Sequence, residues 1–309
     1  MFRRPQQLLA DSVLSLALCL GQGACSGQTD ATASASETGV PGSETSRDQI
    51  RFIPVIDAAG QTVRLQARVC RPAGDAPARL VVINHGSPPN AAARPRMQLG
   101  RCEQEAAQWF LRRGYVVVFA LRRGYGATGG GWAEGYGGCT HPNYVRGGDE
   151  TARDINAVVD YATALPFVRP DGAVVVGQSA GGWGTIAYDS VPHPKVAAFV
   201  VMAGGRGGHE NNEANQNCHP ERLATAAGHF GATATTPMLW IYAANDSFFA
   251  PPIVHDFHEA FIDAGGKAEL HQLGPYDGDG HQLFLGPGGS AIWGPLVERY
   301  LAQQHAEAS

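Results

Sequence analysis

Residues 173–182 read Ala-Val-Val-Val-Gly-Gln-Ser-Ala-Gly-Gly, and this stretch decides the fold class that we expect. The apolar run at 173–176 is typical of a buried parallel strand, and residues 182–188 can form a helix. Between them stands Gly-x-Ser-x-Gly, which predicts a sharp turn that exposes the Ser179 hydroxyl above the sheet. A Cβ at either flanking position would clash, which explains the two glycines. The motif is weak by itself in a chain with 40 glycines, so its surroundings matter more.

Strands and helices alternate along residues 50–305. Alternating apolar residues at 50–56 and 63–69 predict an antiparallel hairpin at a sheet edge. Helical spacing predicts helices at 102–113 and 148–165. Continuous apolar runs predict buried strands at 80–84, 115–121, 173–176, 196–202 and 237–242. This order predicts an α/β fold with a mostly parallel sheet, helices on both faces, and ligands beyond the carboxyl ends of the strands.

Three side chains that follow separate strands have the chemistry of a catalytic triad. A serine hydroxyl needs a base to take its proton, and the base needs an acid that holds its tautomer. Asp246 follows the strand at 237–242, and His281 follows the last predicted strand by a loop, so the chain order is serine, acid, histidine. The alternatives are a helix cap for Asp246 and an ordinary loop histidine for His281.

The oxyanion that develops during attack needs two hydrogen-bond donors. We expect the first to be the backbone N–H of Ala180, at the start of the helix after the serine. The second should come from the turn at 85–87, and Ser87 is the choice because Pro88 and Pro89 have no N–H. The alternative is a tight turn with no catalytic role.

Aromatic side chains on or near the predicted rim loops are candidates for a substrate pocket, although plain packing is an equal alternative. They are Trp132, Tyr136, Trp183, Phe248 and Phe249. The segment 204–236 is longer than a plain connection and predicts a small cap over the site. We expect Arg122 and Arg123 to tie loops together. No metal-ligand spacing, phosphate loop or dinucleotide fingerprint is present, so we expect no metal and no cofactor.

The amino-terminal residues predict export. Residues 1–25 have a basic start, a short apolar middle and small residues at the end, as in a secretory signal peptide. The ending resembles a bacterial lipobox, in which Cys25 would be lipidated and would tether the protein to a membrane; a disordered extension is the alternative. Residues 26–48 predict a flexible linker, and residues 49–309 the folded domain.

Four cysteines lie outside that segment, and an even number in an exported protein permits two disulfides. We pair Cys70 with Cys102 and Cys139 with Cys218; four free thiols are the alternative. The net charge of −5 and pI near 6.1 argue against a nucleic-acid partner, which would require a basic face.

The motifs together resemble an α/β-hydrolase of the dienelactone hydrolase-like and prolyl oligopeptidase-like group. The resemblance covers about residues 50–303 and is carried by Asn84-His85-Gly86, the Gly-rich run at 123–130, Gly177-Gln178-Ser179-Ala180-Gly181-Gly182, Asn245-Asp246 and Gly280-His281. It implies the triad of Ser179, Asp246 and His281. Dienelactone hydrolases use a cysteine nucleophile, and oligopeptidases carry a β-propeller that this chain lacks.

From these observations we expect a secreted, periplasmic or membrane-tethered serine hydrolase. It would cleave small carboxylic esters through an acyl-enzyme intermediate and use no cofactor. Two alternatives stay open: a serine peptidase or amidase on the same triad, and a non-catalytic binding protein on a hydrolase fold.

Overall fold

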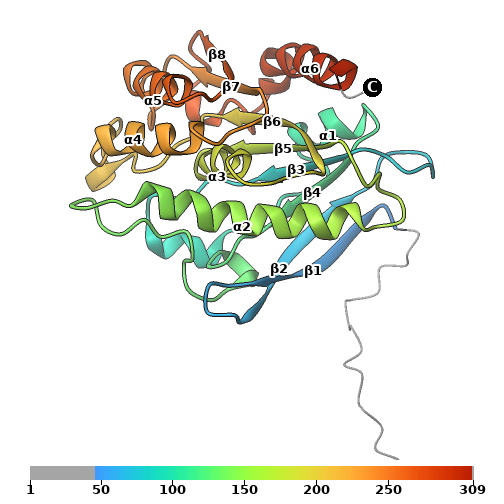
Figure 1. Ribbon diagram of the computed structural model, residues 1–309. Helices are drawn as coiled ribbons and strands as arrows, with labels where there is room; N and C mark the ends of the chain where they lie inside the picture. The colour runs from blue at the N-terminus through green and yellow to red at the C-terminus, as the bar shows by residue number, and fades with distance from the viewer. Residues whose placement is uncertain (1–45, 308–309) are drawn as a thin grey trace, which may run out of the picture. The chain divides into compact units, whose positions relative to one another are not determined.

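An eight-stranded sheet runs through residues 46–307, the part of the chain that the computed structural model describes (Figure 1). The order is β1-β2-β4-β3-β5-β6-β7-β8, and β3 to β8 are parallel. The strands are β1 (Asp48–Ile56), β2 (Thr62–Cys70), β3 (Leu80–Asn84), β4 (Val116–Ala120), β5 (Ala173–Gln178), β6 (Val196–Met202), β7 (Met238–Ala243) and β8 (Ala268–Leu273). The predicted signal peptide, including Cys25, lies outside the described residues.

The predicted hairpin is confirmed at one edge of the sheet. Strands β1 and β2 pair antiparallel along their full length, and β2 also pairs antiparallel with β4. Side chains on β1 alternate because only one face of this hairpin meets the core: Ile53 and Val55 are buried, while Phe52 and Ile56 are exposed.

Helices cover both faces of the sheet, as the alternation predicts. The helices α2 to α5 pack on one face and α1 and α6 on the other, so each face has its own apolar core. In Figure 1, α2 crosses in front of the sheet, and α6 lies at the carboxyl end. The helices are α1 (Glu105–Leu111), α2 (Tyr144–Thr163), α3 (Ala180–Asp189), α4 (Pro220–Gly231), α5 (Pro251–Asp263) and α6 (Gly289–Glu307).

The starts of two helices differ most from the sequence prediction. Helix α2 begins at Tyr144, four residues before the expected start, because the Asn143 side chain accepts a hydrogen bond from the backbone N–H of Arg146 and caps it. Helix α1 begins only at Glu105, and the Cys102 carbonyl instead accepts a hydrogen bond from the side chain of Gln108.

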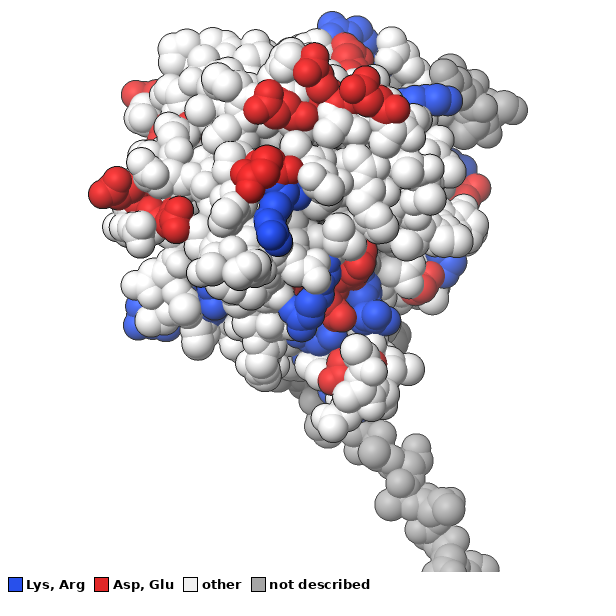
Figure 2. All heavy atoms as spheres, turned by 60° about the vertical axis from the view of Figure 1, so that its left-hand side comes forward, with Lys and Arg blue, Asp and Glu red and all other residues white. Residues whose placement is uncertain are grey.

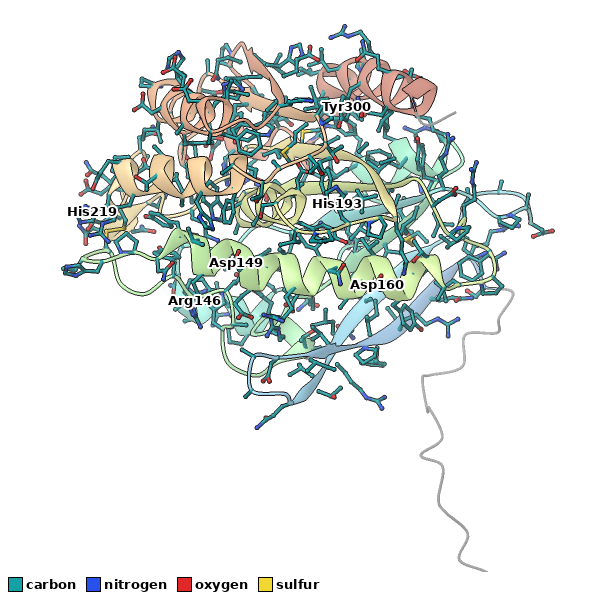
Figure 3. All side chains as sticks on the ribbon, viewed as in Figure 1. Arg146, Asp149, Asp160, His193, His219 and Tyr300 are labelled. Atoms are coloured by element: carbon teal, nitrogen blue, oxygen red, sulfur yellow. A yellow bond between two sulfur atoms is a disulfide. The ribbon has the colours of Figure 1, made fainter. Side chains whose placement is uncertain are left out.

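Helix α6 is fixed to the sheet by Tyr300, which is labelled in Figure 3. Its hydroxyl donates to the Pro237 carbonyl at 2.6 Å and accepts from the Phe199 N–H at 3.1 Å. No helix within residues 46–307 is long and apolar enough to cross a membrane. On the face shown in Figure 2, acidic and basic side chains are interspersed and form no continuous basic patch.

Candidate active site

Ser179 occupies a strained turn between β5 and α3. Its φ of 55° and ψ of −121° are rare for a residue with a side chain, and such strain is typical of a nucleophile held above a sheet. A Cβ at Gly177 would lie 2.3 Å from the Gly181 carbonyl oxygen, and one at Gly181 would lie 2.5 Å from the Asn84 carbonyl oxygen. The two glycines are therefore required by close packing, as the motif predicts.

Asp246 and His281 form a buried pair on the rim beside this turn. Nδ1 of His281 lies 3.0 and 3.1 Å from the two carboxylate oxygens of Asp246. His281 is 4% exposed and Asp246 is 1% exposed. Because a carboxylate accepts, Nδ1 carries the proton and Nε2 is left as the acceptor. Asp246 also accepts from the backbone N–H groups of Phe248 and Phe249, so the turn before α5 holds the carboxylate in place.

A second carboxylate, Asp279, joins the loops that carry the acid and the base. It accepts from the backbone N–H of His281 at 3.0 Å and from the N–H and hydroxyl of Ser247 at 3.0 and 2.8 Å. Burial raises the pKa of Asp279, but these hydrogen bonds outweigh it and leave the pKa below its usual value. Asp279 therefore holds the turn after β7 and the loop of His281 together.

Ser179 and His281 line the same cavity. Gln178, which precedes the serine, donates from Nε2 to the His281 carbonyl at 3.1 Å and links the two loops. Within the described residues the Ser179 hydroxyl makes no hydrogen bond of its own, and catalytic hydrogen bonds commonly shorten only when substrate is bound. The structure thus brings all three predicted triad residues to one site, with the acid–base contact already formed.

The predicted oxyanion loop lies directly against the serine. A Cβ at Gly86 would lie 2.9 Å from the Ser179 Cβ, so only glycine permits this approach. Ser87 lies on the same cavity wall as Ser179, and Ala180 begins α3 immediately after it. Both predicted donors therefore belong to the segments that surround the serine.

His85 holds this loop in shape as a neutral imidazole. Nδ1 donates to the Gly86 carbonyl at 2.7 Å, and Nε2 accepts from the backbone N–H of Arg122 at 3.2 Å. Burial and the adjacent Arg122 guanidinium lower the pKa of His85 to about 3, so both contacts persist at neutral pH. The side chain of Arg122 also donates to the His85 carbonyl at 2.7 Å.

A buried ionic network supports the far side of the loop. The Glu134 carboxylate forms ion pairs with Nε of Arg122 at 2.6 Å and with Nη2 of Arg206 at 2.9 Å. It also accepts hydrogen bonds from the hydroxyl groups of Tyr125 and Thr151. Burial raises the pKa of Glu134, but the two guanidinium groups outweigh it and hold the pKa well below its usual value. Arg122 therefore ties loops together, as predicted, with Glu134 as its partner.

Two cavities open beside Ser179. The first, about 330 Å³, is here called the apolar pocket; no Asp, Glu, Lys or Arg lines it, and its apolar walls include Ile83, Met97, Leu99, Phe119, Phe284 and Leu285. The second, about 100 Å³, is here called the guanidinium pocket because Arg94 and Arg206 line it. Phe248 belongs to both, so the serine stands at a boundary between two chemically different spaces.

Comparison with known proteins agrees with this architecture. Residues 103–205, which include the elbow, match the model of the prolyl oligopeptidase family, whereas no curated protein sequence matches the chain. An esterase from Pyrococcus furiosus is 16% identical with a TM-score of 0.53, over 83% of this chain and 93% of that one. A Klebsiella pneumoniae protein described as a dienelactone hydrolase is 16% identical with a TM-score of 0.53, over 82% and 99%.

The chain has the α/β-hydrolase fold, and residues 103–205 resemble the prolyl oligopeptidase family. A dipeptidyl peptidase 4 from Porphyromonas gingivalis shares the fold at 16% identity and a TM-score of 0.57, over 84% of this chain but only 36% of that one. Solved structures that share this fold thus include both esterases and peptidases. Likeness at this identity establishes the fold and leaves the substrate to the residues of the site.

The predicted aromatic residues separate into two groups. Trp132, Tyr136, Phe248 and Phe249 line the guanidinium pocket. Trp183 does not: it is fully buried in the core, donates from Nε1 to the Tyr144 carbonyl at 2.9 Å and packs against Phe230. One helical turn beyond Ser179, its side chain points into the protein, so nearness in sequence to the nucleophile misled the prediction.

Both disulfides form in the expected pairs, Cys70–Cys102 and Cys139–Cys218. The second ties the loop before α2 to the segment after β6. Arg146, labelled in Figure 3 on α2, donates to the Gly135 carbonyl in that loop. The disulfide thereby fixes two walls of the guanidinium pocket, which contains Cys218 itself.

The predicted cap at 204–236 is only partly a cap. Residues 205–210 and Cys218 line the guanidinium pocket, but α4 packs beside α5 in the helix layer (Figure 1). Leu223 and Phe230 of α4 are fully buried in that layer. The length of the segment suggested a cap, whereas its second half carries the apolar spacing of an ordinary covering helix.

One side-chain group among the described residues has metal-like geometry: Cys139, Glu210 and Cys218. Because the two sulfurs are joined in a disulfide, neither can act as a thiolate ligand, and the group is not a metal site. Sequence patterns did not reveal the roles of Glu134, Arg94 or Arg206. Their contacts join loops far apart in the chain, and only an unusual number of arginines near predicted rim loops could have drawn attention to them.

Proposed function

We propose that this protein is a serine hydrolase that cleaves carboxylic esters. The observation that carries the proposal is the strained Ser179 in the same cavity as the Asp246–His281 pair. A protein that only binds ligands would not need a strained serine together with a histidine whose Nε2 is free to accept a proton.

The residues have complementary roles in this proposal. His281 accepts the Ser179 proton at Nε2 while the serine oxygen attacks the ester carbonyl, and the backbone N–H groups of Ser87 and Ala180 donate to the oxyanion. His281 then gives the proton to the departing alkoxide, which leaves as the alcohol. Water attacks the acyl-enzyme, and its proton returns through His281 to Ser179.

The apolar pocket favours an ester over a peptide substrate. A peptide amino terminus carries a positive charge and requires a carboxylate partner, but the wall of this pocket contains none. Neutral aliphatic or aromatic ester groups can fill it by apolar burial. Glu210, at the other pocket, is the acid that would favour the peptidase alternative.

The test compares p-nitrophenyl acetate and butyrate with alanine, proline and glycyl-proline p-nitroanilides at pH 8. We expect ester turnover with kcat/KM at least about 100-fold above every anilide and above the Ser179→Ala variant. Ser190→Ala is the matched control, since its hydroxyl lies at the other end of α3 and donates to the Ala187 carbonyl. Anilide turnover equal to ester turnover would establish the peptidase alternative instead.

We also propose export to an oxidising compartment, with Cys25 as a membrane anchor. The two disulfides support export, because such bonds persist outside reducing cytoplasm. Expression of the full chain in a bacterium, followed by membrane fractionation and mass spectrometry of residue 25, tests the anchor. A diacylated Cys25 is expected; a soluble periplasmic protein cleaved without lipid would refute the anchor alone.

A further inference from the structure

The guanidinium pocket holds more positive charge than the protein neutralises. Arg122 and Arg206 are each at most 4% exposed, yet within residues 46–307 Glu134 is the single carboxylate within salt-bridge distance of either. One negative charge therefore serves two buried guanidinium groups. Taking a cation out of water is costly unless an anion accompanies it.

Arg206 is also incompletely hydrogen-bonded. Nη2 donates to the Thr151 hydroxyl at 2.8 Å and lies 2.9 Å from Glu134, but Nε is buried without any partner. Nη1 likewise donates to no described residue, and the side chain lines the pocket. A guanidinium carries five N–H groups, so most of this donor capacity is unused.

Arg94 adds a second cation to the wall of the pocket. Its guanidinium carbon lies 3.4 Å from the ring centre of Trp132, and its buried Nε has no hydrogen-bond partner. No carboxylate within the described residues forms an ion pair with it. Stacking on Trp132 fixes the orientation of the guanidinium plane without using its N–H donors.

The other charged and titratable groups of this pocket do not remove the excess. Glu210 and His209 lie on its wall, and Glu210 forms no ion pair with Arg94 or Arg206. Arg123 and Arg153 are neutralised separately by Asp154 and Glu150. Arg94 and Arg206, whose guanidinium groups lack a full set of partners, thus both line a small cavity whose wall includes Ser179 and Ala180.

We propose that the guanidinium pocket binds a carboxylate carried by the ester substrate, through Arg94 and Arg206. This inference rests on the proposed ester hydrolase function and narrows its substrate class to acidic esters, such as half-esters of dicarboxylic acids or esters of hydroxybenzoic acids. A carboxylate matches the planar fork of a guanidinium and supplies the missing negative charge. The apolar pocket receives the uncharged part of the same substrate.

The test measures kcat/KM for two pairs that differ only in a carboxylate and its neutral amide isostere. The acyl-side pair is the p-nitrophenyl half-ester of glutaric acid and that of glutaric acid monoamide. The alcohol-side pair is para-acetoxybenzoate and para-acetoxybenzamide. We expect the acid to exceed the amide about 10- to 100-fold in one pair, as for charge-assisted hydrogen bonds. Equal rates, or a preference for the amide, in both pairs would overturn the inference.

The variant Arg94→Gln should reduce that preference about 10-fold, mainly through a lower kcat/KM for the acid. Arg96→Gln, in the same short helix but exposed and outside the pocket, is the matched control. Arg206→Gln should abolish the preference. The Tm of this variant is measured as well, because the substitution also removes the ion pair with Glu134. If Arg94→Gln lowers both rates equally, the charge serves the oxyanion and the inference is wrong.

The two proposals can fail separately. If the wild-type protein hydrolyses neither the esters that carry the neutral amide group nor simple acetate esters, the ester hydrolase function itself is refuted. Wild-type protein that hydrolyses the neutral esters without any carboxylate preference would refute only the acidic-substrate inference.

Discussion

The apolar pocket and the guanidinium pocket share Ser179 and Phe248 but differ in how their walls are held. The walls of the apolar pocket include core side chains of β3 and β4, such as Ile83 and Phe119, which gain stability from burial itself. The walls of the guanidinium pocket are loops held by ions and a disulfide. The first pocket is a consequence of the fold, whereas the second contains incompletely paired guanidinium groups that cost stability until an anion binds them.

The largest predicted effect removes the machinery that both pockets share. Asp246→Asn should lower kcat about 10³- to 10⁴-fold for acidic and neutral esters alike, because the amide cannot hold His281 in the required tautomer. Asp256→Asn, an exposed acid on α5, is the control. The measurement is kcat for both substrate pairs under steady-state conditions. A loss confined to one pair would mean that Asp246 does not serve a common triad.

The next prediction concerns the apolar pocket alone. Leu285 lies on its rim and is 39% exposed, so Leu285→Trp can enter the cavity without disturbing the core. Exclusion of about two methylenes costs about 1.6 kcal/mol, or about 15-fold in kcat/KM for an octanoyl or octyl ester. Ile262→Trp, exposed on α5, is the control. An unchanged chain-length profile for both long esters would show that this cavity takes no substrate.

The two disulfides sharpen the comparison further. Replacing either pair by serines should cost about 2 to 4 kcal/mol in the free energy of unfolding. Only the Cys139→Ser/Cys218→Ser variant should also reduce the acid-over-amide preference, by about 3- to 10-fold, since that disulfide joins two walls of the guanidinium pocket. Urea unfolding and kcat/KM ratios measure the two effects. Loss of preference in the Cys70→Ser/Cys102→Ser variant would contradict this division.

The smallest effect is a pH dependence of stability through His85. Its pKa, about 3 when folded, is lower than in the unfolded chain, where it is about 6.5. The unfolded chain therefore binds an extra proton between those values, and stability falls as pH decreases through that window. Relative to His85→Gln, which keeps an acceptor for the Arg122 N–H, wild type should lose about 1.4 kcal/mol more per pH unit from pH 5.5 to 4.5. Parallel stability curves would show that His85 titrates normally.

Sequence reasoning succeeded where the strand order alone positions a residue. Ser179, Asp246 and His281 each follow a parallel strand, so the topology brings them to one rim whatever the loops contain. It failed for Trp183, because the direction of a side chain on α3 depends on the turn that precedes it. Sequence reasoning also could not predict the charge balance of the site. Glu134 pairs with both Arg122 and Arg206 because three loops meet, and no local sequence pattern encodes that meeting.

The most direct test of the central claim is covalent labelling of the full-length protein with a fluorophosphonate, read by peptide mass spectrometry. The account predicts a single adduct on Ser179, absent in Ser179→Ala, retained in Ser190→Ala and strongly slowed in Asp246→Asn. No adduct on the folded wild-type protein, or an adduct on another serine, would contradict the assignment of Ser179 as the nucleophile.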